Sequence, residues 1–305
     1  MIFKMKQLTT ILALLAGFTM NAQWSYNSNG KGGIETIGAN ASVGGSTAMG
    51  SGKASGGTST AMGHDTEASG AISTAMGYDT EASGDWSTAM GDYTVASGDW
   101  STSMGYSTTA SGEASTAIGA GTTASDFASL SIGQLNSVNS TVTTGGSRTS
   151  FDTDNAAFVI GNGTASDARA DAFVVYYNGN ATLSGELTVN SDERLKDNIQ
   201  PLGSTLNKLH QIEGKTYSLK KDEKHTARIG VLAQEVLAVF PELVSDGANG
   251  ILSVNYQGLV PVLINAINEQ GLKIAALEAQ NSEIKEMIRV LTLQQSQTPS
   301  RAAAN

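Results

Sequence analysis

Apolar residues in the first half of the chain recur with a period of 14 residues, after one 13-residue step. The block Ser-Thr-Ala-Met-Gly begins at Ser46, Ser59, Ser73 and Ser87, and variants of it begin at Ser101, Ser115 and Ser129. An Ala-Ser-Gly block lies midway through the units from Ala54 to Ala110, and it fades to Ala-Ser-Asp at Ala124. Because self-similarity at a fixed period is the signature of stacked repeats, this half of the chain predicts a β-solenoid.

A unit of this length has room for two strands of about five residues and two turns. Stacked units place equivalent side chains in columns along the roll, and three columns stand out: Met62, Met76, Met90, Met104 and Ile118; Thr66, Thr80, Thr94, Thr108 and Thr122; Ile72, Trp86 and Trp100. Ala and Ser fill most other positions, so each coil is narrow. On a single chain the Met and Trp columns would therefore be exposed to solvent. We therefore expect a trimer that covers at least one of these columns.

The repeat ends near residue 145, and alternating strand patterns follow over residues 146–190. We expect strands at 158–161 and 172–177, a two-residue hairpin turn at Asn178-Gly179, and a third strand over 181–189. This segment is predicted to be a β-rich neck after the head repeats of residues 23–145.

Heptad spacing dominates the end of the chain. Residues seven apart form two rows: Val260, Ile267, Ile274, Asn281 and Ile288, and three positions later Leu263, Gln270, Leu277, Ile284 and Leu291. Isoleucine-rich rows favour more than two strands, and the polar Asn281 and Gln270 would fix the register. We predict a three-stranded coiled coil over residues 259–292 and a disordered tail over 293–305.

The N-terminus has the pattern of a secretory signal peptide. Lys4 and Lys6 precede an apolar run from Leu8 to Phe18, and small residues follow near Ala22. That run is too short to span a bilayer comfortably. We expect residues 1–22 to be removed before Gln23, which makes the protein secreted or displayed at a cell surface with no membrane span left.

Composition narrows the classes of partner. The chain has no cysteine, which excludes disulfides, thiolate metal sites and lipid attachment through cysteine. From Gln23 to Asn190, 4 basic side chains stand against 15 acidic ones, a net charge of −11. Nucleic acids and anionic membranes bind basic surfaces, so neither is an expected partner. His210 and His225 have no clustered ligands at metal-site spacing, and we expect no metal and no cofactor.

Residues 191–199 read Ser-Asp-Glu-Arg-Leu-Lys-Asp-Asn-Ile. A serine becomes a nucleophile when a neighbouring base takes its proton, and a lysine is such a base when burial or nearby cations lower its pKa. One irregular turn can bring Ser191 and Lys196 together. The string equally fits a serine that caps a short helical turn, and on residue types alone this capping role is the stronger interpretation.

The whole string resembles the start of the endosialidase-type intramolecular chaperone domain. Later segments at 230–236, 240–244 and 254–256 also look like motifs of that family, and the resemblance extends from Ser191 to about Leu291. Such domains fold a phage tail spike or surface fibre as a trimer and then cut themselves off at the serine. The resemblance implies a chaperone domain over residues 191–258 that acts as a peptidase on its own chain only. It also implies roles for individual residues: Lys196 as general base for the nucleophile Ser191, cleavage after Asn190, and support from Arg194, Asn198, Gln234 and Glu235.

The repeats over residues 34–133 resemble the head repeat of YadA-like trimeric autotransporter adhesins, which implies a left-handed parallel β-roll. The predicted fold is therefore a mostly β N-terminal half, followed by an α+β domain that ends in a coiled coil. The predicted function is a homotrimeric, adhesin-like fibre that matures by autoproteolysis. Two alternatives are a glycan-binding or glycan-depolymerising spike and an ice-binding solenoid, the latter because Thr columns resemble ice-binding ladders. The predicted partners are two further copies of the chain and a host-surface or glycan ligand.

Overall fold

The computed structural model describes residues 25–26, 34–35, 38–137, 143, 146–220, 222 and 224–297. The predicted signal peptide lies outside these residues. The chain divides into two compact units between Val189 and Asn190.

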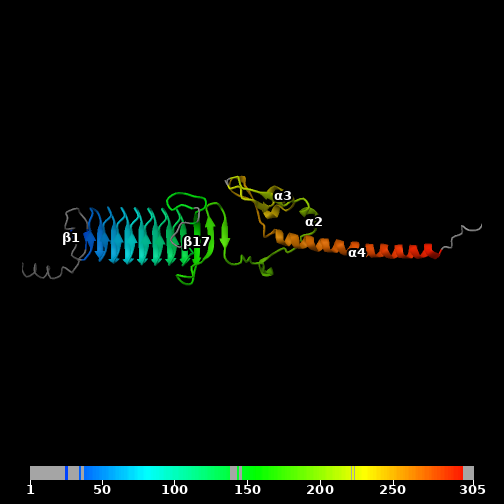
Figure 1. Cartoon of the computed structure of the whole chain (residues 1–305), viewed down its shortest axis with the longest axis horizontal. Helices are drawn as coiled ribbons and strands as arrows, with labels where there is room; N and C mark the ends of the chain where they lie inside the picture. Colours follow the sequence, from blue (N-terminus) through cyan, green and yellow to red (C-terminus); the bar gives the residue numbers. More distant parts are fainter. Residues whose placement is uncertain are drawn as a thin grey trace, which may run out of the picture. The chain divides into compact units, whose positions relative to one another are not determined.

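The N-terminal unit is a parallel β-solenoid, which confirms the expected fold of the repeats (Figure 1). Each coil contributes one strand to a long sheet and one to a second sheet. The long sheet contains β1 Ser25–Tyr26, β2 Ile34–Glu35, β4 Thr47–Gly50, β6 Thr60–His64, β8 Thr74–Tyr78, β10 Thr88–Asp92, β12 Thr102–Tyr106, β14 Thr116–Ala120, β16 Leu130–Gln134, β17 Ala156–Asn162, β18 Asp171–Tyr176 and β19 Ala181–Leu183. The second sheet contains β3 Asn40–Ala41, β5 Lys53–Ala54, β7 Glu67–Ala68, β9 Glu81–Ala82, β11 Val95–Ala96, β13 Thr109–Ala110 and β15 Thr123–Ala124.

Strands in the second sheet are two residues long, not the five predicted. On that side of the coil the chain turns at the Ala-Ser-Gly block, where the Ser and Gly N–H groups donate to the same alanine carbonyl of the next coil, as Ser69 and Gly70 do to Ala82. In the long sheet, the strands from β6 to β16 do have five residues, and they pair in register across coils, so Met76 lies beside Met90 and Met90 beside Met104.

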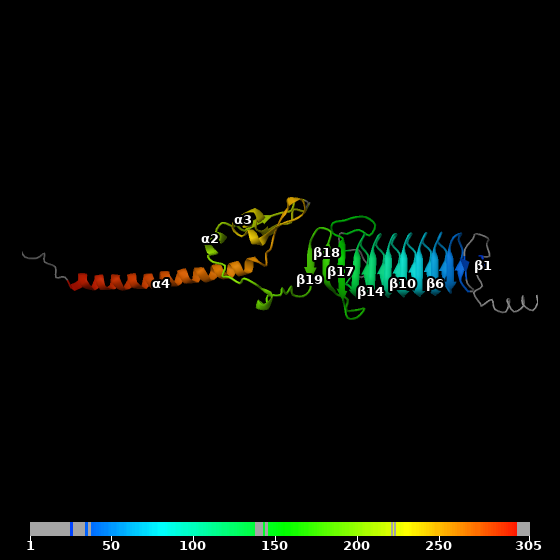
Figure 2. The same ribbon diagram turned by 180° about the vertical axis from the view of Figure 1, so that it is seen from behind.

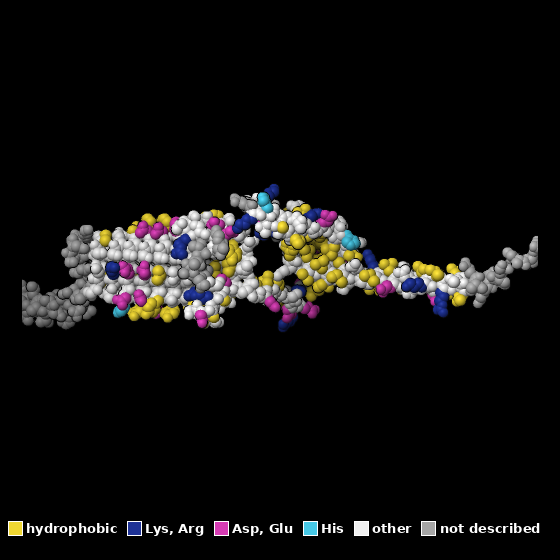
Figure 3. Space-filling view, in the orientation of Figure 1, with side chains coloured by type: hydrophobic (Ala, Val, Ile, Leu, Met, Phe, Trp, Pro, Cys, Tyr) yellow, Lys and Arg dark blue, Asp and Glu magenta, His cyan; other side chains and the backbone are white. Residues whose placement is uncertain are grey.

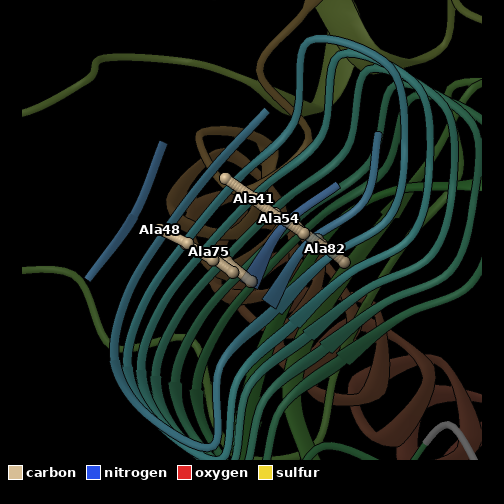
Figure 4. Packing of buried hydrophobic residues seen from close by; sticks show 9 residues of the cluster. Ala41, Ala48, Ala54, Ala75 and Ala82 are labelled. Carbon is tan, nitrogen blue, oxygen red and sulfur yellow. The ribbon is translucent and has the colours of Figure 1, made fainter. Parts of the chain in front are cut away.

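Alanine side chains form the core of the roll. Two rows of alanines run along its axis, one from each sheet, and Figure 4 shows Ala41, Ala54 and Ala82 in one row and Ala48 and Ala75 in the other. These side chains are at most 1% exposed. Because the apolar groups between the sheets are mostly alanine methyl groups, the roll is stabilised mainly by its backbone ladders and not by a large apolar core.

Glycine is required where consecutive coils approach most closely. At Gly77 the backbone has φ 132°, and a Cβ atom there would lie 1.8 Å from the carbonyl oxygen of Gly91. No side chain fits in that space, which explains why a glycine follows the Met or Ile of the long strand in every unit.

The columns predicted from the sequence lie on different sides of the coil wall. Met side chains on the long strands point outward and are half-buried, whereas Ile72, Trp86 and Trp100 are about half exposed. The Thr column points inward: Thr66, Thr80, Thr94, Thr108 and Thr122 are at most 1% exposed. An ice-binding ladder must face the solvent, so this column cannot be one.

The C-terminal end of the roll is closed by an antiparallel meander. β17 continues the parallel ladder beside β16, and β18 and β19 then add antiparallel to it. The buried Asp126 carboxylate supports this end, because it accepts hydrogen bonds from the backbone N–H groups of Thr143 and Ala156. The third predicted strand is shorter than expected: β19 ends at Leu183, and residues 184–190 are exposed and irregular.

The C-terminal unit is a small α+β fold on a long helix. Its elements are η1 Glu193–Leu195, α2 Leu206–Leu209, β20 Lys215–Tyr217, β21 Arg228–Gly230, α3 Ala233–Val239, η2 Pro241–Leu243, β22 Val244–Asp246, η3 Ala248–Gly250, β23 Leu252–Val254 and α4 Leu259–Gln297. Val236, Phe240 and Val262 form its buried core, so α3 packs on the first turns of α4. Figures 1 and 2 show α4 as one continuous helix, which runs past the expected coiled-coil end at residue 292.

A carboxylate on α4 holds the start of α2. Glu269 accepts hydrogen bonds from the backbone N–H of Thr205 at 2.6 Å and from the Ser204 hydroxyl at 2.9 Å. Asn265 donates to the same carboxylate and to the carbonyl oxygen of Gly203. These bonds, led by the one from the Thr205 N–H, hold the pKa of Glu269 below its ordinary value although partial burial opposes them.

The predicted coiled-coil rows of α4 are exposed on the single chain. Ile267 is 65% exposed, and Ile274, Leu277, Ile284, Ile288 and Leu291 lie between 48% and 59%. Gln270 and Asn281 are exposed in the same rows. Among the described residues, no helix has a stretch long and apolar enough to cross a membrane.

Candidate active site

A single 3₁₀ turn, η1, sets the geometry around Ser191. Asp192 caps this turn by accepting a hydrogen bond from the backbone N–H of Arg194 at 2.9 Å. The Arg194 guanidinium also donates two hydrogen bonds to the same carboxylate, from Nε to Oδ1 at 3.0 Å and from Nη2 to Oδ2 at 2.7 Å. This pairing lowers the pKa of Asp192 and raises the pKa of Arg194, so both remain charged in the neutral range.

The turn brings Ser191 and Lys196 together. The backbone N–H of Lys196 donates to the Glu193 carbonyl at 3.0 Å, which closes the turn and folds the lysine side chain back. Lys196 Nζ lies 2.7 Å from Ser191 Oγ and donates a hydrogen bond to it. The capping role considered for Ser191 belongs to its neighbour Asp192.

This contact has the geometry that a nucleophile and its base require. For catalysis the proton must move the other way, from the serine hydroxyl to a neutral amine. Ser191 and Lys196 are both exposed on the single chain. A lysine takes up a proton from a serine only in its neutral form, which burial away from water favours.

The other predicted residues lie at several places in the C-terminal unit. Asn190 precedes the turn and is exposed, and the Asn198 N–H donates to Asp197 at 2.8 Å. Gln234 and Glu235 lie on α3, where Glu235 accepts from the backbone N–H of Glu213 at 3.0 Å. Within the described part of the chain, neither side chain hydrogen-bonds to Ser191 or Lys196.

Comparison with known families places this turn at the start of a recognised domain. Residues 191–245 match the family model described as the chaperone of endosialidase, and the match begins at Ser191. Residues 191–245 of the C-terminal unit are therefore similar to an endosialidase-type chaperone domain. Residues 54–80, 68–94, 82–102 and 96–122 match the YadA head domain repeat. Both resemblances expected from the sequence are therefore confirmed.

Curated relatives of the chain are phage tail fibres. The long tail fiber protein Gp37 of Salmonella phage S16 is 32% identical over 125 residues, which cover 38% of this chain and 17% of that protein. A probable tail fiber protein of Escherichia phage Phieco32 is 35% identical over 99 residues, which cover 30% of this chain and 14% of that protein. The chain thus spans less than a fifth of the length of these relatives.

Sequence reasoning did not single out the Asp192–Arg194 pair as a unit. It proposed Arg194 from the family resemblance and gave the capping role to Ser191. The pair was visible in the sequence, because an acid at the cap and a basic residue two positions later can meet across one 3₁₀ turn.

Proposed function

We propose that this protein is a homotrimeric fibre whose C-terminal chaperone domain drives trimer assembly and then cuts the bond between Asn190 and Ser191. The observation that carries the proposal is the 2.7 Å contact between Lys196 Nζ and Ser191 Oγ, one residue after the boundary between the two compact units. A cut at this position would release the roll from the chaperone domain without breaking any strand of either.

The proposed reaction has two steps. Neutral Lys196 takes the proton of Ser191 Oγ, the oxygen attacks the carbonyl carbon of Asn190, and the C–N bond breaks as the Ser191 amine takes a proton. The Asn190 acyl group is then an ester on Ser191 Oγ. Water attacks this ester, which frees the Asn190 carboxylate and restores the serine hydroxyl.

Assembly and cleavage are linked by burial. The exposed rows on α4 are apolar in the pattern of a three-stranded coiled coil, and three such helices would bury them against one another. The outward Met face of the roll offers a second surface without charge. In the trimer, neighbouring copies would also exclude water from Ser191 and Lys196, which would lower the lysine pKa only once assembly is complete.

Mass spectrometry of the purified protein tests the proposal. Wild type should yield two fragments, the smaller of which begins at Ser191. Ser191→Ala should yield one intact chain that is still a trimer. Lys196→Arg should also remain intact, since a guanidinium keeps its proton near neutral pH. Normal cleavage in either variant would show that the Ser191–Lys196 pair does not perform the reaction.

A further inference from the structure

Three large apolar side chains line one corner of the roll, where the chain passes from the second sheet to the next long strand. Ile72, Trp86 and Trp100 occupy this corner in consecutive coils and are 52%, 47% and 52% exposed. We call them the Trp ridge. The rings of Trp86 and Trp100 stack with their centroids 5.2 Å apart and their planes 4° apart. Figure 3 shows apolar side chains beside acidic ones along the edges of the roll.

The backbone holds the ridge in a fixed geometry. The Trp86 N–H donates to the Ala71 carbonyl at 2.7 Å, and the Trp100 N–H donates to the Asp85 carbonyl at 2.8 Å. The spacing of the rings therefore follows the rise of the solenoid. A partner would meet a surface whose side chains are already ordered, which reduces the entropy lost on binding.

The fold itself does not need these residues. Their φ angles are 57°, 55° and 56°, a left-handed conformation that a β-branched or bulky residue rarely adopts. The same corner position holds Thr58, Ala114 and Ala128 in other coils, with the same backbone. Ile72, Trp86 and Trp100 thus combine backbone strain with apolar exposure in three adjacent coils only. Such a combination marks a functional surface.

Contact between copies of the roll is better served by another face. An interface that runs along a solenoid needs an uncharged column in every coil, and the Met column provides one from Met49 to Ile132. The Trp ridge spans three coils and has a carboxylate, Asp85 or Asp99, directly before each Trp. Residues 38–135 contain nine acidic and one basic side chain, so another copy of the roll has almost no cations to offer.

The chemistry of the ridge indicates a cationic protein partner. The two indoles stack with one face of each against the other, so neither a sugar ring nor a cation can enter between them. Exposed Trp edges and an Ile side chain are typical anchors for an apolar groove of another protein. Asp85 Oδ1 accepts from the Ala71 N–H and Asp99 Oδ1 from the Asp85 N–H, which aligns the two carboxylates beside the ridge.

We propose that the Trp ridge binds a cationic, amphipathic polypeptide segment. Its apolar side chains cover Ile72, Trp86 and Trp100, and its Lys or Arg side chains pair with Asp85 and Asp99. This rests on the proposed function, in which the cut releases the roll as the mature fibre, and it names a class of partner for that roll.

Calorimetric titration of the full chain tests the proposal with defined probes. The first probe is a 14-residue peptide of alternating Leu and Lys; the others are the same peptide with Glu in place of Lys, and cellohexaose. The Leu-Lys peptide should bind, and the Trp86→Ala/Trp100→Ala variant should bind it at least about tenfold more weakly, as expected for lost anchors.

The Asp85→Asn/Asp99→Asn variant removes both charges but keeps both Oδ1 acceptors, and it should also bind the Leu-Lys peptide more weakly. The matched control, Tyr78→Ala/Tyr106→Ala at the opposite corner, should bind as wild type does.

Several results would overturn the proposal: undiminished binding by the Trp variant, equal binding of the Leu-Glu peptide, or binding of cellohexaose alone. Sedimentation equilibrium on the same samples separates it from the proposed function. A Trp variant that loses the trimer would make the ridge a contact between copies, which also overturns the proposal. If the wild-type protein binds the Leu-Lys peptide through the ridge but is not a trimer, the proposed peptide binding stands and the proposed homotrimeric fibre is wrong.

Discussion

The inward-facing Thr hydroxyls of the roll differ from one coil to the next. Thr108 Oγ1 lies 2.7 Å from Ser103 Oγ, because one coil has serine where its neighbours have alanine. The Oγ1 atoms of Thr66, Thr80, Thr94 and Thr122 have no hydrogen-bond partner among the described residues. A buried hydroxyl without a partner is unfavourable by about 1–3 kcal/mol.

Two substitutions at equivalent positions should therefore shift stability in opposite directions. Ser103→Ala removes the partner of Thr108 and should destabilise the roll by about 1–3 kcal/mol, whereas Ala75→Ser gives Thr80 a partner and should stabilise it by up to about 1 kcal/mol. Thermal unfolding followed by circular dichroism compares both variants with wild type. A lower melting temperature for Ala75→Ser would mean that the narrow interior has no space for one more oxygen atom.

At the scale of single elements, the join between α2 and α4 depends on one carboxylate. The folded-state pKa of Glu269 is lowered, chiefly by the Thr205 N–H. Its contribution to stability is therefore complete above the unfolded-state pKa of about 4.3 and is lost as the pH falls through the lower folded-state pKa.

We expect hydrogen exchange at the Thr205 and Leu206 amides to accelerate in acid once the pH is below about 4, after correction for intrinsic rates. Glu269→Gln should exchange fast at neutral pH already and lose this acid dependence. Glu278→Gln, an exposed position on the same helix, is the control and should behave as wild type. If the exchange rates of these two amides depend on pH equally in wild type and in Glu269→Gln, a group other than Glu269 causes the acid sensitivity.

The exposed heptad rows of α4 lead to a second prediction, about the role of this helix in assembly. Ile274→Asp puts a charge into the proposed three-helix interface and should reduce both the trimer fraction and the cleavage yield. Ala279→Asp adds the same charge to the same helix outside the rows and should do neither. Sedimentation equilibrium and intact mass measure the two effects. Full cleavage in a monomeric Ile274→Asp protein would separate cutting from assembly.

Much of this architecture could be predicted from the sequence because equivalent positions of a repeat stack on one another. The 14-residue period alone identifies the Met, Thr and Trp columns. It did not reveal that the Thr column faces inward, since the left-handed residue before each Thr, such as Asp65 with φ 52°, interrupts the strand alternation. The spacing of Ser191 and Lys196 was local and therefore predictable. The bond between Glu269 and Thr205 was not, because 64 residues separate them.

For the whole molecule, the order of events decides whether the fold can be regained. Alignment of three solenoids in register depends on contacts between chains and is slow, whereas a coiled coil forms from local contacts and raises the local concentration of the rolls. If the chaperone domain leaves after assembly, the mature fibre has lost the element that aligned it and persists because it unfolds slowly.

Denaturation and dilution should therefore separate the two forms. The uncut Ser191→Ala trimer should recover its oligomeric state after denaturant is removed, and the released roll of wild type should not. Sedimentation equilibrium before and after the cycle measures the recovery. Equal recovery of both forms would show that the roll carries its own assembly information.

The in-register ladder of the roll also makes its length a modular quantity. Along the long sheet, neighbouring described coils from β6 to β16 pair through the same five positions, and β17 continues this ladder from β16. Whole units can therefore be gained or lost by recombination between the near-identical repeats without a change at either end. Each event would alter the reach of the head by one strand spacing, about 4.8 Å. Loss of a whole unit keeps each glycine opposite its counterpart, so natural variation in this head should be counted in whole units of 14 residues or, as between Ser46 and Ser59, 13.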